Sequence, residues 1–297
     1  MASMIDRYLL RYLLAVIDQG NFSRAADACG VSQPTLSVGI AKLERELGRV
    51  LLRRTSRRVE LTEAGAHFAA HARRIEAEFL VAERAADESP GRATFRLGVL
   101  ATIPTPLIEA VLIDLRRAGA TTRLELVEAS ERDLNERLAR GRVDAAVTIL
   151  RGERDRSSAM PLFTEGYALA MAADHPLAHL PVIAPGQLAD NVMIVRRHCE
   201  LLSETSRYFT SHGVRPFFAA RTTSEDRALA LVRRGLGVTV MPDSFRHPGV
   251  VRPALVDFTF TRTIGIVPAA HADSAAFAGS EVVQALLRTL KEPVVSG

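Results

Sequence analysis

The stretch "SQPTLSVGIAKLEREL", from Ser32 to Leu47, decides the fold of the N-terminal part of this chain. Ser32 can cap a helix with its hydroxyl, and Pro34 stands in the first turn, where a missing N–H costs little. Apolar residues then recur at helical spacing along one face: Leu36, Ile40, Leu43 and Leu47. Because Gly48 is a typical helix stop, the stretch predicts a capped, amphipathic helix.

The residues before this helix predict two more helices. Apolar residues between positions 10 and 17 repeat with helical spacing, and Gly20 ends that segment. Ser23 can cap a short helix over positions 24–28, and Gly30 makes a tight turn. A short helix, a glycine turn and a second capped helix form the helix-turn-helix pattern, whose second helix enters the major groove of DNA.

Polar and basic residues cover the predicted DNA face. Gln33 can bond an adenine edge in two places, and Thr35 or Ser37 can reach base edges or phosphates. The segment 50–61 reads as two short strands around a polar turn, forming a basic wing suited to phosphates. Its arginines could alternatively be solvated residues of a stabilising hairpin. The expected DNA contacts are Ser32, Gln33, Pro34, Thr35, Ser37, Lys42, Arg53, Arg54, Arg57 and Arg58.

The charge distribution supports this surface. The whole chain carries a net charge of only +4, but positions 42–58 hold seven basic residues against Glu44 and Glu46. Most charge runs are solvated faces, yet a basic run beside a helix-turn-helix favours nucleic acid.

The continuous match from about Leu10 to Gly65, "NFSRAADACGVSQPTLSVGIAKLERELGRVLLRRTSRRVELTEAG" at its centre, resembles the DNA-binding domain of LysR-type transcriptional regulators. The resemblance implies that Gln33, Pro34, Thr35 and Ser37 lie near the DNA and that the wing arginines lie on its backbone. It also implies promoter DNA and RNA polymerase as partners and assembly into homodimers or homotetramers.

A long helix is expected to follow, opened by Thr62 and Glu63. Its seam has heptad spacing: Phe68, Ala72, Ile75, Phe79, Ala82 and Ala86. The seam could pack on its own domain or pair two copies, which would place two recognition helices on successive major grooves. We expect a DNA-binding domain over 1–62, a linker helix and hinge over 63–90, and a regulatory domain over 91–297.

The regulatory domain alternates strands and helices, which predicts an α/β fold with a mostly parallel sheet. We expect two α/β subdomains, one over about 91–163 plus 265–297 and the other over about 164–264, like those of periplasmic binding proteins. Ligands in such folds bind at the carboxyl ends of strands. The candidate effector residues are Thr102, Ile103, Thr148, His198, Cys199, Thr223, Ser224 and Arg262, although Thr102 and Ser224 could merely cap helices.

Composition and motifs restrict the other functional classes. The sequence contains no G-x-S-x-G elbow, no phosphate-binding glycine loop and no zinc motif, so we expect neither an enzyme nor a cofactor nor a metal site. No apolar run approaches a membrane span, and the N-terminus does not resemble a signal peptide. Two distant cysteines do not suggest a disulfide framework. These observations indicate a cytoplasmic protein without membrane contact.

The motifs "GVLATIP", "RHCE" and "RTIGIV" together resemble the peroxide-sensing, OxyR-like branch of the LysR family. In that branch a cysteine directly after a histidine reacts with peroxide, as Cys199 follows His198 here. A second cysteine resolves it, but this chain has Tyr208 and Phe209 around that place. The branch also tends to have a histidine before its "TS" segment, where "FFAARTTS" has none, whereas Arg262 matches an arginine that the branch uses.

Two signals therefore stay open for the regulatory domain. A small organic molecule could bind reversibly beside Phe217 and Phe218, with a carboxylate held by hydroxyls and helix N–H groups. Alternatively, Cys199 could act as a one-cysteine switch for peroxide or hypochlorite, because neighbouring cations favour the reactive thiolate. A cysteine-dependent enzyme is a remote third alternative, since no oriented partner for the thiol can be argued from the sequence.

Overall fold

The computed structural model describes residues 5–54, 59–87, 94–152, 159–269, 272 and 274–291 of the 297-residue chain. The chain divides into two compact units. The first contains Met1–Gly91 with two short segments, Glu136–Arg142 and Ala269–His271, and the second contains the remainder. Within the described residues, every helix is too short or too polar to cross a lipid bilayer.

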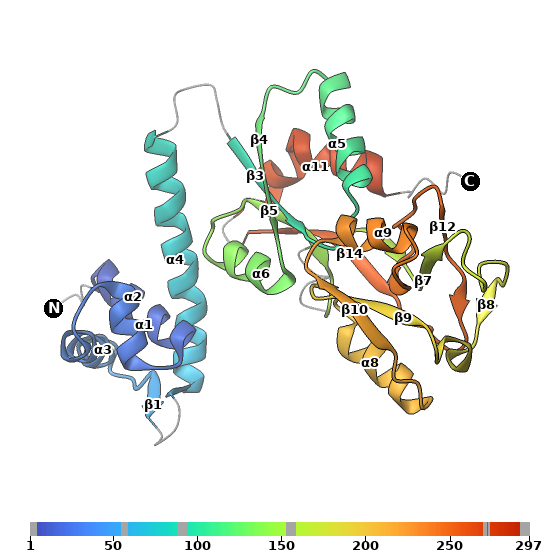
Figure 1. Cartoon of the computed structure of the whole chain (residues 1–297). Coiled ribbons are helices and arrows are strands. Elements are labelled where there is room, and N and C mark those ends of the chain that lie inside the picture. The colour runs from blue at the N-terminus through green and yellow to red at the C-terminus, as the bar shows by residue number, and fades with distance from the viewer. Residues whose placement is uncertain are drawn as a thin grey trace. The chain divides into compact units, whose positions relative to one another are not determined.

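Helices and a small hairpin make up the first unit (Figure 1). Its elements are α1 (Arg7–Gln19), α2 (Phe22–Cys29), α3 (Gln33–Leu47), β1 (Leu52–Arg54), β2 (Val59–Leu61) and α4 (Glu63–Asp87). Leu9, Leu13, Leu36 and Leu43 form its core together with Leu51, all of them fully or almost fully buried. The predicted apolar face of α3 thus packs against α1, and β1 pairs with β2 in antiparallel register. The helix-turn-helix and the two strands of the wing are confirmed.

The cap of α2 differs from the prediction. Asn21, not Ser23, precedes this helix, and its side-chain oxygen accepts the backbone N–H groups of Ser23 and Arg24 at 2.8 and 3.1 Å. Ser23 already lies inside the first turn. An Asn is as good an N-cap as a Ser, and two candidates separated by one residue cannot be ranked by propensity alone. The predicted caps at Ser32 and the helix ends at Gly20 and Gly48 are confirmed.

We expect Asn21→Ala to lower the free energy of unfolding by about 1 kcal/mol, because two N–H groups of α2 lose their acceptor. Ser23→Ala is the matched control and should change the stability by a few tenths of a kcal/mol at most. Urea denaturation of both variants measures the difference. A larger loss in the Ser23 variant would contradict this assignment of the cap.

The predicted seam of α4 is divided between two environments. Ala72 is fully buried, and it packs with Phe68 against Leu10 and Leu14 of α1. Ile75 and Phe79, further along, are each 43% exposed. The first half of the seam therefore packs on its own domain, and the second half leaves large apolar side chains at the surface.

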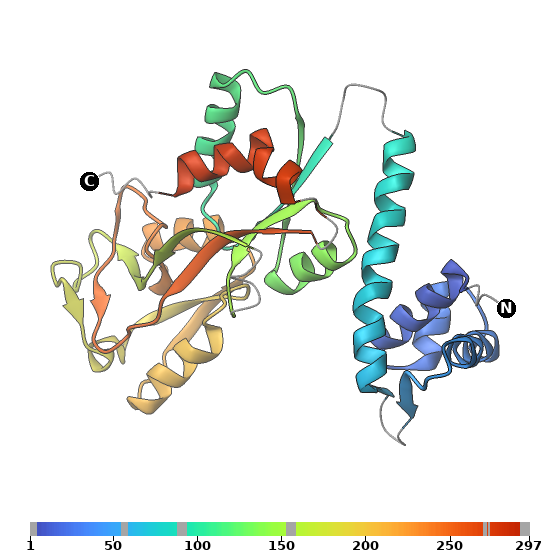
Figure 2. The same ribbon diagram turned by 180° about the vertical axis from the view of Figure 1, so that it is seen from behind.

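The larger part of the second unit is a five-stranded sheet with the order β4-β3-β5-β14-β6. Its strands are β3 (Thr94–Leu100), β4 (Arg123–Ala129), β5 (Ala145–Ile149), β6 (Met160–Glu165) and β14 (Arg262–Pro268). Its helices are α5 (Thr105–Arg117), α10 (Ser274–Gly279), α11 (Glu281–Leu290) and the first half of α6 (Glu131–Ala139), whose residues from Glu136 on are counted with the first unit. Strand β3 runs parallel to β4 and β5, whereas β14 runs antiparallel to β5 and β6. Helices α5 and α11 pack together on one face of the sheet, and α6 lies on the other (Figures 1 and 2).

Smaller sheets form the rest of the second unit. Strand β7 (Tyr167–Ala172) lies between β11 (Thr239–Pro242) and β12 (Val250–Val251). Two further pairs are parallel: β9 (Val192–Arg196) with β10 (Phe217–Thr222), and β8 (Val182–Ile183) with β13 (Ala254–Leu255). The remaining elements are a short 3₁₀ helix η1 (Pro185–Leu188), α8 (Leu202–Ser211) and α9 (Glu225–Arg233). The mixed α/β fold is confirmed, and β14 belongs to the five-stranded sheet. The expectation of a mostly parallel sheet is wrong, because two of the four strand pairings, β5 with β14 and β14 with β6, are antiparallel.

Two further details of the second unit correct the sequence-based prediction. Strand β6 was not predicted, although it pairs with β14 at the edge of the first sheet. The apolar periodicity over 277–290 predicts one last helix, but this segment belongs to two helices, α10 and α11, with Ser280 between them. Serine favours helix N-caps over helix interiors, which accounts for the new start at Glu281.

Candidate DNA-binding and sensing sites

The first turn of α3 presents the residues expected to read DNA. Ser32 accepts the backbone N–H of Thr35 at 3.2 Å, and the two hydroxyl oxygens lie 2.7 Å apart. Gln33 Nε2 donates to Ser37 Oγ at 3.0 Å. The side chains of Ser32, Gln33, Pro34 and Thr35 are exposed, whereas Ser37 is half-buried. The predicted cluster thus lies at the exposed start of the second helix of the motif.

Lys42 is placed differently from the other predicted DNA contacts. Its Nζ lies 3.0 Å from an Asp6 carboxylate oxygen and 3.3 Å from the Tyr8 hydroxyl. These bonds, the one to Asp6 first, raise the pKa of Lys42 and tie it to the segment that begins α1. Lys42 therefore already has partners within the protein, so a phosphate would have to compete for it.

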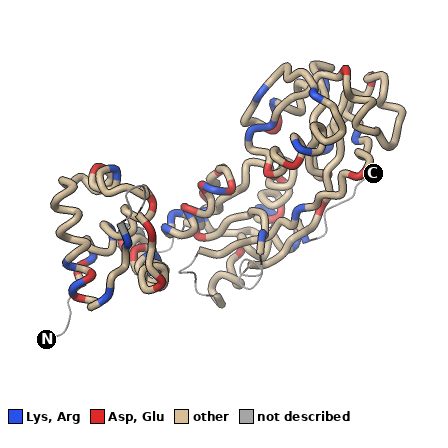
Figure 3. The backbone as a smooth tube through the Cα atoms, turned by 90° about the horizontal axis from the view of Figure 1, so that it is seen from below, with Lys and Arg blue, Asp and Glu red and all other residues tan. Residues whose placement is uncertain are grey.

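The wing contributes one described arginine side chain to this surface. Arg53 is exposed on β1, whereas the side chain of Arg54 and the whole of Arg57 and Arg58 lie outside the described residues. Figure 3 shows basic and acidic residues interspersed along the backbone of this unit. Sequence reasoning missed Val38, which is 70% exposed on α3. An apolar residue between helical core positions, pointing outward, was the available signal, and such a side chain can contact a thymine methyl group.

In the second unit, Thr102 and Arg262 meet in a buried cluster. Arg262 Nη1 donates to Thr102 Oγ1 and Nη2 donates to the Thr102 carbonyl, both at 2.9 Å. The same guanidinium binds Glu165 at 2.7 Å and Glu200 at 2.6 Å. Because two carboxylates of the protein already hold Arg262, this cluster offers no free cation for an anionic effector.

Tyr167 completes the cluster through a 2.6 Å hydrogen bond from its hydroxyl to Glu200. Burial raises the pKa of Tyr167, and the adjacent Glu200 charge raises it further. Burial also raises the pKa of Glu200, but the Arg262 charge and the Tyr167 O–H outweigh it, so the net shift is downward. The carboxylate of Glu200 is therefore held charged in the interior.

The other predicted effector residues do not form one site. Ile103 and Thr148 are buried, and Thr148 Oγ1 has no hydrogen-bond partner among the described residues. His198 and Thr223 are exposed. Ser224 accepts the backbone N–H of Arg227 at 3.2 Å and so caps α9, which is the structural alternative considered above.

Cys199 contacts a second buried ion pair. Arg196, 2% exposed, forms a salt bridge with Glu225 and donates from Nη1 to the Val240 carbonyl at 2.7 Å. The same Nη1 lies 3.6 Å from Cys199 Sγ. Burial raises the pKa of the Cys199 thiol, and the Arg196 charge lowers it by less. Burial likewise raises the pKa of Glu225 above its ordinary value. The thiol is therefore predominantly protonated near neutral pH.

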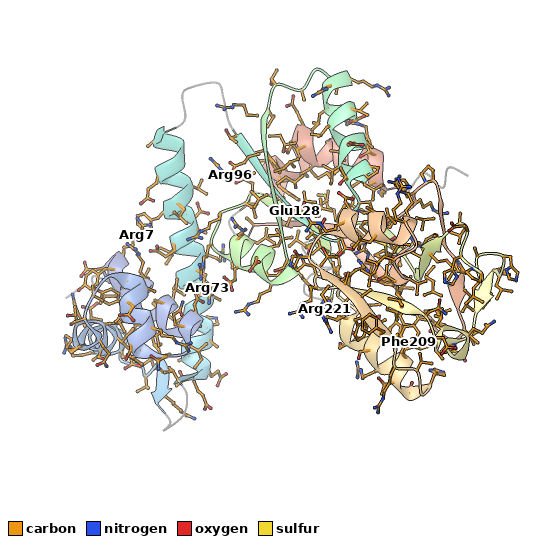
Figure 4. All side chains as sticks on the ribbon, in the orientation of Figure 1. Arg7, Arg73, Arg96, Glu128, Phe209 and Arg221 are labelled. Carbon is orange, nitrogen blue, oxygen red and sulfur yellow. The ribbon has the colours of Figure 1, made fainter. Side chains whose placement is uncertain are left out.

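Cys199 and Arg196 also line a cavity of about 600 Å³. Its walls come from β9, β10 and α8, and they include Ile194, Phe209, Val214 and Phe218. The lining also includes Arg221 of β10, and both Phe209 and Arg221 are labelled in Figure 4. The cavity is mostly apolar, and neither Glu200 nor Arg262 is among its lining residues.

Sequence reasoning missed the acidic members of both clusters. Glu200 directly follows Cys199, and Glu225 directly follows the helix cap at Ser224. A carboxylate at a strand end or a helix start is usually solvated, so neither position signalled burial. Among the described residues, no group of three or more His, Cys, Asp or Glu side chains could hold a metal ion.

Family models and relatives agree with this architecture. The model of the bacterial regulatory helix-turn-helix protein, lysR family, matches residues 8–66, and the LysR substrate binding domain model matches residues 88–292. The "DNA-binding transcriptional dual regulator OxyR" of Escherichia coli is 32% identical over 87% of each chain. A "Probable hydrogen peroxide-inducible genes activator" of Mycobacterium avium is 36% identical over 79% of this chain and 77% of its own length.

Solved structures give the same result. Full-length OxyR from Pseudomonas aeruginosa matches with a TM-score of 0.54 and 25% identity over 97% of this chain and 98% of its own. HinK, a LysR family transcriptional regulator from the same organism, has a TM-score of 0.54 at 18% identity over 97% of this chain and 98% of its own, which shows the fold alone. The chain therefore belongs to the LysR family of transcriptional regulators: it is a DNA-binding regulator with a helix-turn-helix domain and an effector-binding domain, and not an enzyme.

Proposed function

We propose that this regulator binds promoter DNA as a homodimer or homotetramer, through the start of α3 and the wing, and changes its action on RNA polymerase when a small organic molecule occupies the cavity beside Cys199. The observation that carries this proposal is the 600 Å³ apolar cavity that Cys199 and Arg196 line. Its size is typical of small-molecule sites. The exposed Ile75 and Phe79 of α4 support a contact between two copies.

The state of Cys199 favours reversible binding over oxidation. The raised pKa leaves little thiolate, which is the form that attacks peroxides. Cys29 is the second of the two cysteines, and it belongs to the other compact unit. Tyr208 occupies the place around which a resolving cysteine would be expected, and its hydroxyl donates to the Val256 carbonyl at 2.5 Å.

Oxidation of Cys199 is the second candidate, because Arg196 Nη1 lies 3.6 Å from its sulfur and the Mycobacterium avium relative is named a probable activator of hydrogen peroxide-inducible genes. Without a resolving thiol, oxidation would end at a sulfenic acid or a mixed disulfide. The test is a footprint on genomic DNA fragments selected by the protein, with wild type and Cys199→Ser, before and after hydrogen peroxide. We expect both footprints to stay unchanged by peroxide. A peroxide response in wild type that the serine variant loses would establish the redox switch instead.

We expect Gln33→Ala to weaken binding to the selected DNA site by about 1–3 kcal/mol, because a bidentate contact to an adenine edge is lost. Equilibrium titration of labelled DNA measures this change. Binding to a random duplex is the control, and it should stay the same, since non-specific affinity comes from phosphate contacts. An unchanged preference between the two duplexes would remove Gln33 from base recognition.

A further inference from the structure

We propose that the cavity beside Cys199 is a binding site for an amphipathic organic carboxylate, distinct from the cluster around Thr102 and Arg262. This inference rests on the proposed function and names the chemical class of its signal. The cluster around Arg262 is filled by Glu165 and Glu200, whereas the cavity is an open volume of about 600 Å³.

The walls of the cavity select an apolar body. Ile194 of β9, Phe218 of β10 and Phe209 of α8 all contribute apolar side chains to the lining. Val214 continues the apolar wall beyond α8. Displacing water from such a surface is favourable in proportion to the apolar area covered, so an alkyl or aryl group fits here.

Two buried polar atoms in the lining residues lack partners and select the polar group of the ligand. Arg196 Nη2 and Thr205 Oγ1 have no hydrogen-bond partner among the described residues. Both residues line the cavity, and Arg196 is only 2% exposed. A buried donor without an acceptor is unfavourable, and both groups are donors. An acceptor oxygen on the ligand would give these two donors the hydrogen bonds that the described residues do not supply.

The charges of the lining favour an anion over a neutral acceptor. The described lining contains three arginines, Arg196, Arg215 and Arg221, and neither Asp nor Glu. Glu225 already pairs with Arg196 through Nε, so the additional attraction comes from the exposed Arg215 and Arg221. Within the described part of the chain neither of these two forms an ion pair, and Arg221 lies over the Phe218 ring at 5.5 Å. A carboxylate matches guanidinium groups in both charge and geometry.

The test uses three probes of equal chain length, decanoate, decanol and decylamine, with the full-length protein. Isothermal titration should show saturable binding of decanoate and at least about tenfold weaker binding of the other two. Thr205→Val removes one hydroxyl without changing the shape of the side chain, and it should weaken the binding of decanoate by about tenfold. Ser203→Ala on the same helix is the control, because Ser203 is exposed and does not line the cavity, and this variant should bind decanoate like wild type.

Alkylation of the two cysteines locates the bound probe. Peptide mass spectrometry measures the rate at which iodoacetamide alkylates each cysteine. Decanoate should slow the alkylation of Cys199 and leave that of Cys29, the internal control, unchanged. If decanoate does not bind, or does not protect Cys199 from alkylation, the proposed site is refuted. Equal binding and protection by decanol overturns the carboxylate class but leaves the cavity as a sensor. Binding with protection but without any change in the DNA footprint upholds the site and contradicts the proposed function.

Discussion

Replacing Arg262 with Met is expected to lower the free energy of unfolding of the regulatory domain by about 3–5 kcal/mol, because it leaves buried carboxylates without their cation. Arg262 is 4% exposed and binds Glu165, Glu200 and both oxygens of Thr102. Because methionine keeps the apolar length of the side chain, the lost free energy of unfolding comes from removing the guanidinium group and not from opening a cavity. Urea denaturation followed by circular dichroism measures it.

Arg288→Met is the matched control for this experiment. Arg288 pairs with Asp114 at 2.7 Å, but its side chain is half exposed, and surface pairs contribute about 0–1 kcal/mol. A loss in the Arg262 variant no larger than in the Arg288 variant would show that Glu165 and Glu200 find other partners.

Acid should reduce the difference in the free energy of unfolding between wild type and the Arg262→Met variant. The pKa of Glu200 is lowered in the folded protein, so its contribution to stability is present above its unfolded pKa, about 4.3, and is lost as the pH falls through the folded value. In the variant the carboxyl can protonate and its burial then costs less. Unfolding curves at pH 7 and near pH 4 measure this convergence, and a constant difference would argue against a charged Glu200.

The second large effect is expected in the first unit, where Leu43→Ala should lower the free energy of unfolding by about 2–5 kcal/mol. Leu43 is completely buried on α3 among Leu9, Leu13 and Leu36, and truncation leaves a space that packed helices cannot fully close. Thermal unfolding measures the loss, and DNA binding should fall at temperatures where this unit melts. Val38→Ala, on the same helix but 70% exposed, should unfold like wild type. Equal losses of stability in the two variants would contradict the burial of Leu43 and the exposure of Val38 on α3.

The helices and strands of the first unit were largely predictable, because their signals are local. Ser32, Gly48 and the spacing of Leu36, Ile40 and Leu43 specify α3 within one short stretch. The cap of α2 was missed because Asn21 and Ser23 are equally good by residue type, and only the backbone geometry distinguishes them. The break at Ser280 was missed because a single serine weighs little against the apolar periodicity of the surrounding helix.

The buried clusters of the second unit were predictable only in part. The pattern around Thr102 and Arg262 singled out both residues, and the structure brings them together at 2.9 Å. Glu165 and Glu200 could not be found in the same way, since the residues of this cluster are separated by tens of positions and meet only in the tertiary fold. Burial also reversed the expectation for Cys199: cations nearby in sequence predicted a lowered pKa, whereas removal from water dominates.

The adjacency of Cys199 and Glu200 has a mechanical consequence. These two neighbours are joined by one peptide unit but face different surroundings, Cys199 the apolar cavity and Glu200 the arginine that grips Thr102 at the end of β3. A peptide unit is stiff, and only one soft backbone torsion flanks it on each side, ψ of Cys199 and φ of Glu200. We therefore expect an occupant that displaces the sulfur to shift the backbone of Glu200, and with it the carboxylate that binds Arg262. Through this short link, a ligand in the cavity is expected to act on Arg262 at the start of β14 and so on the five-stranded sheet.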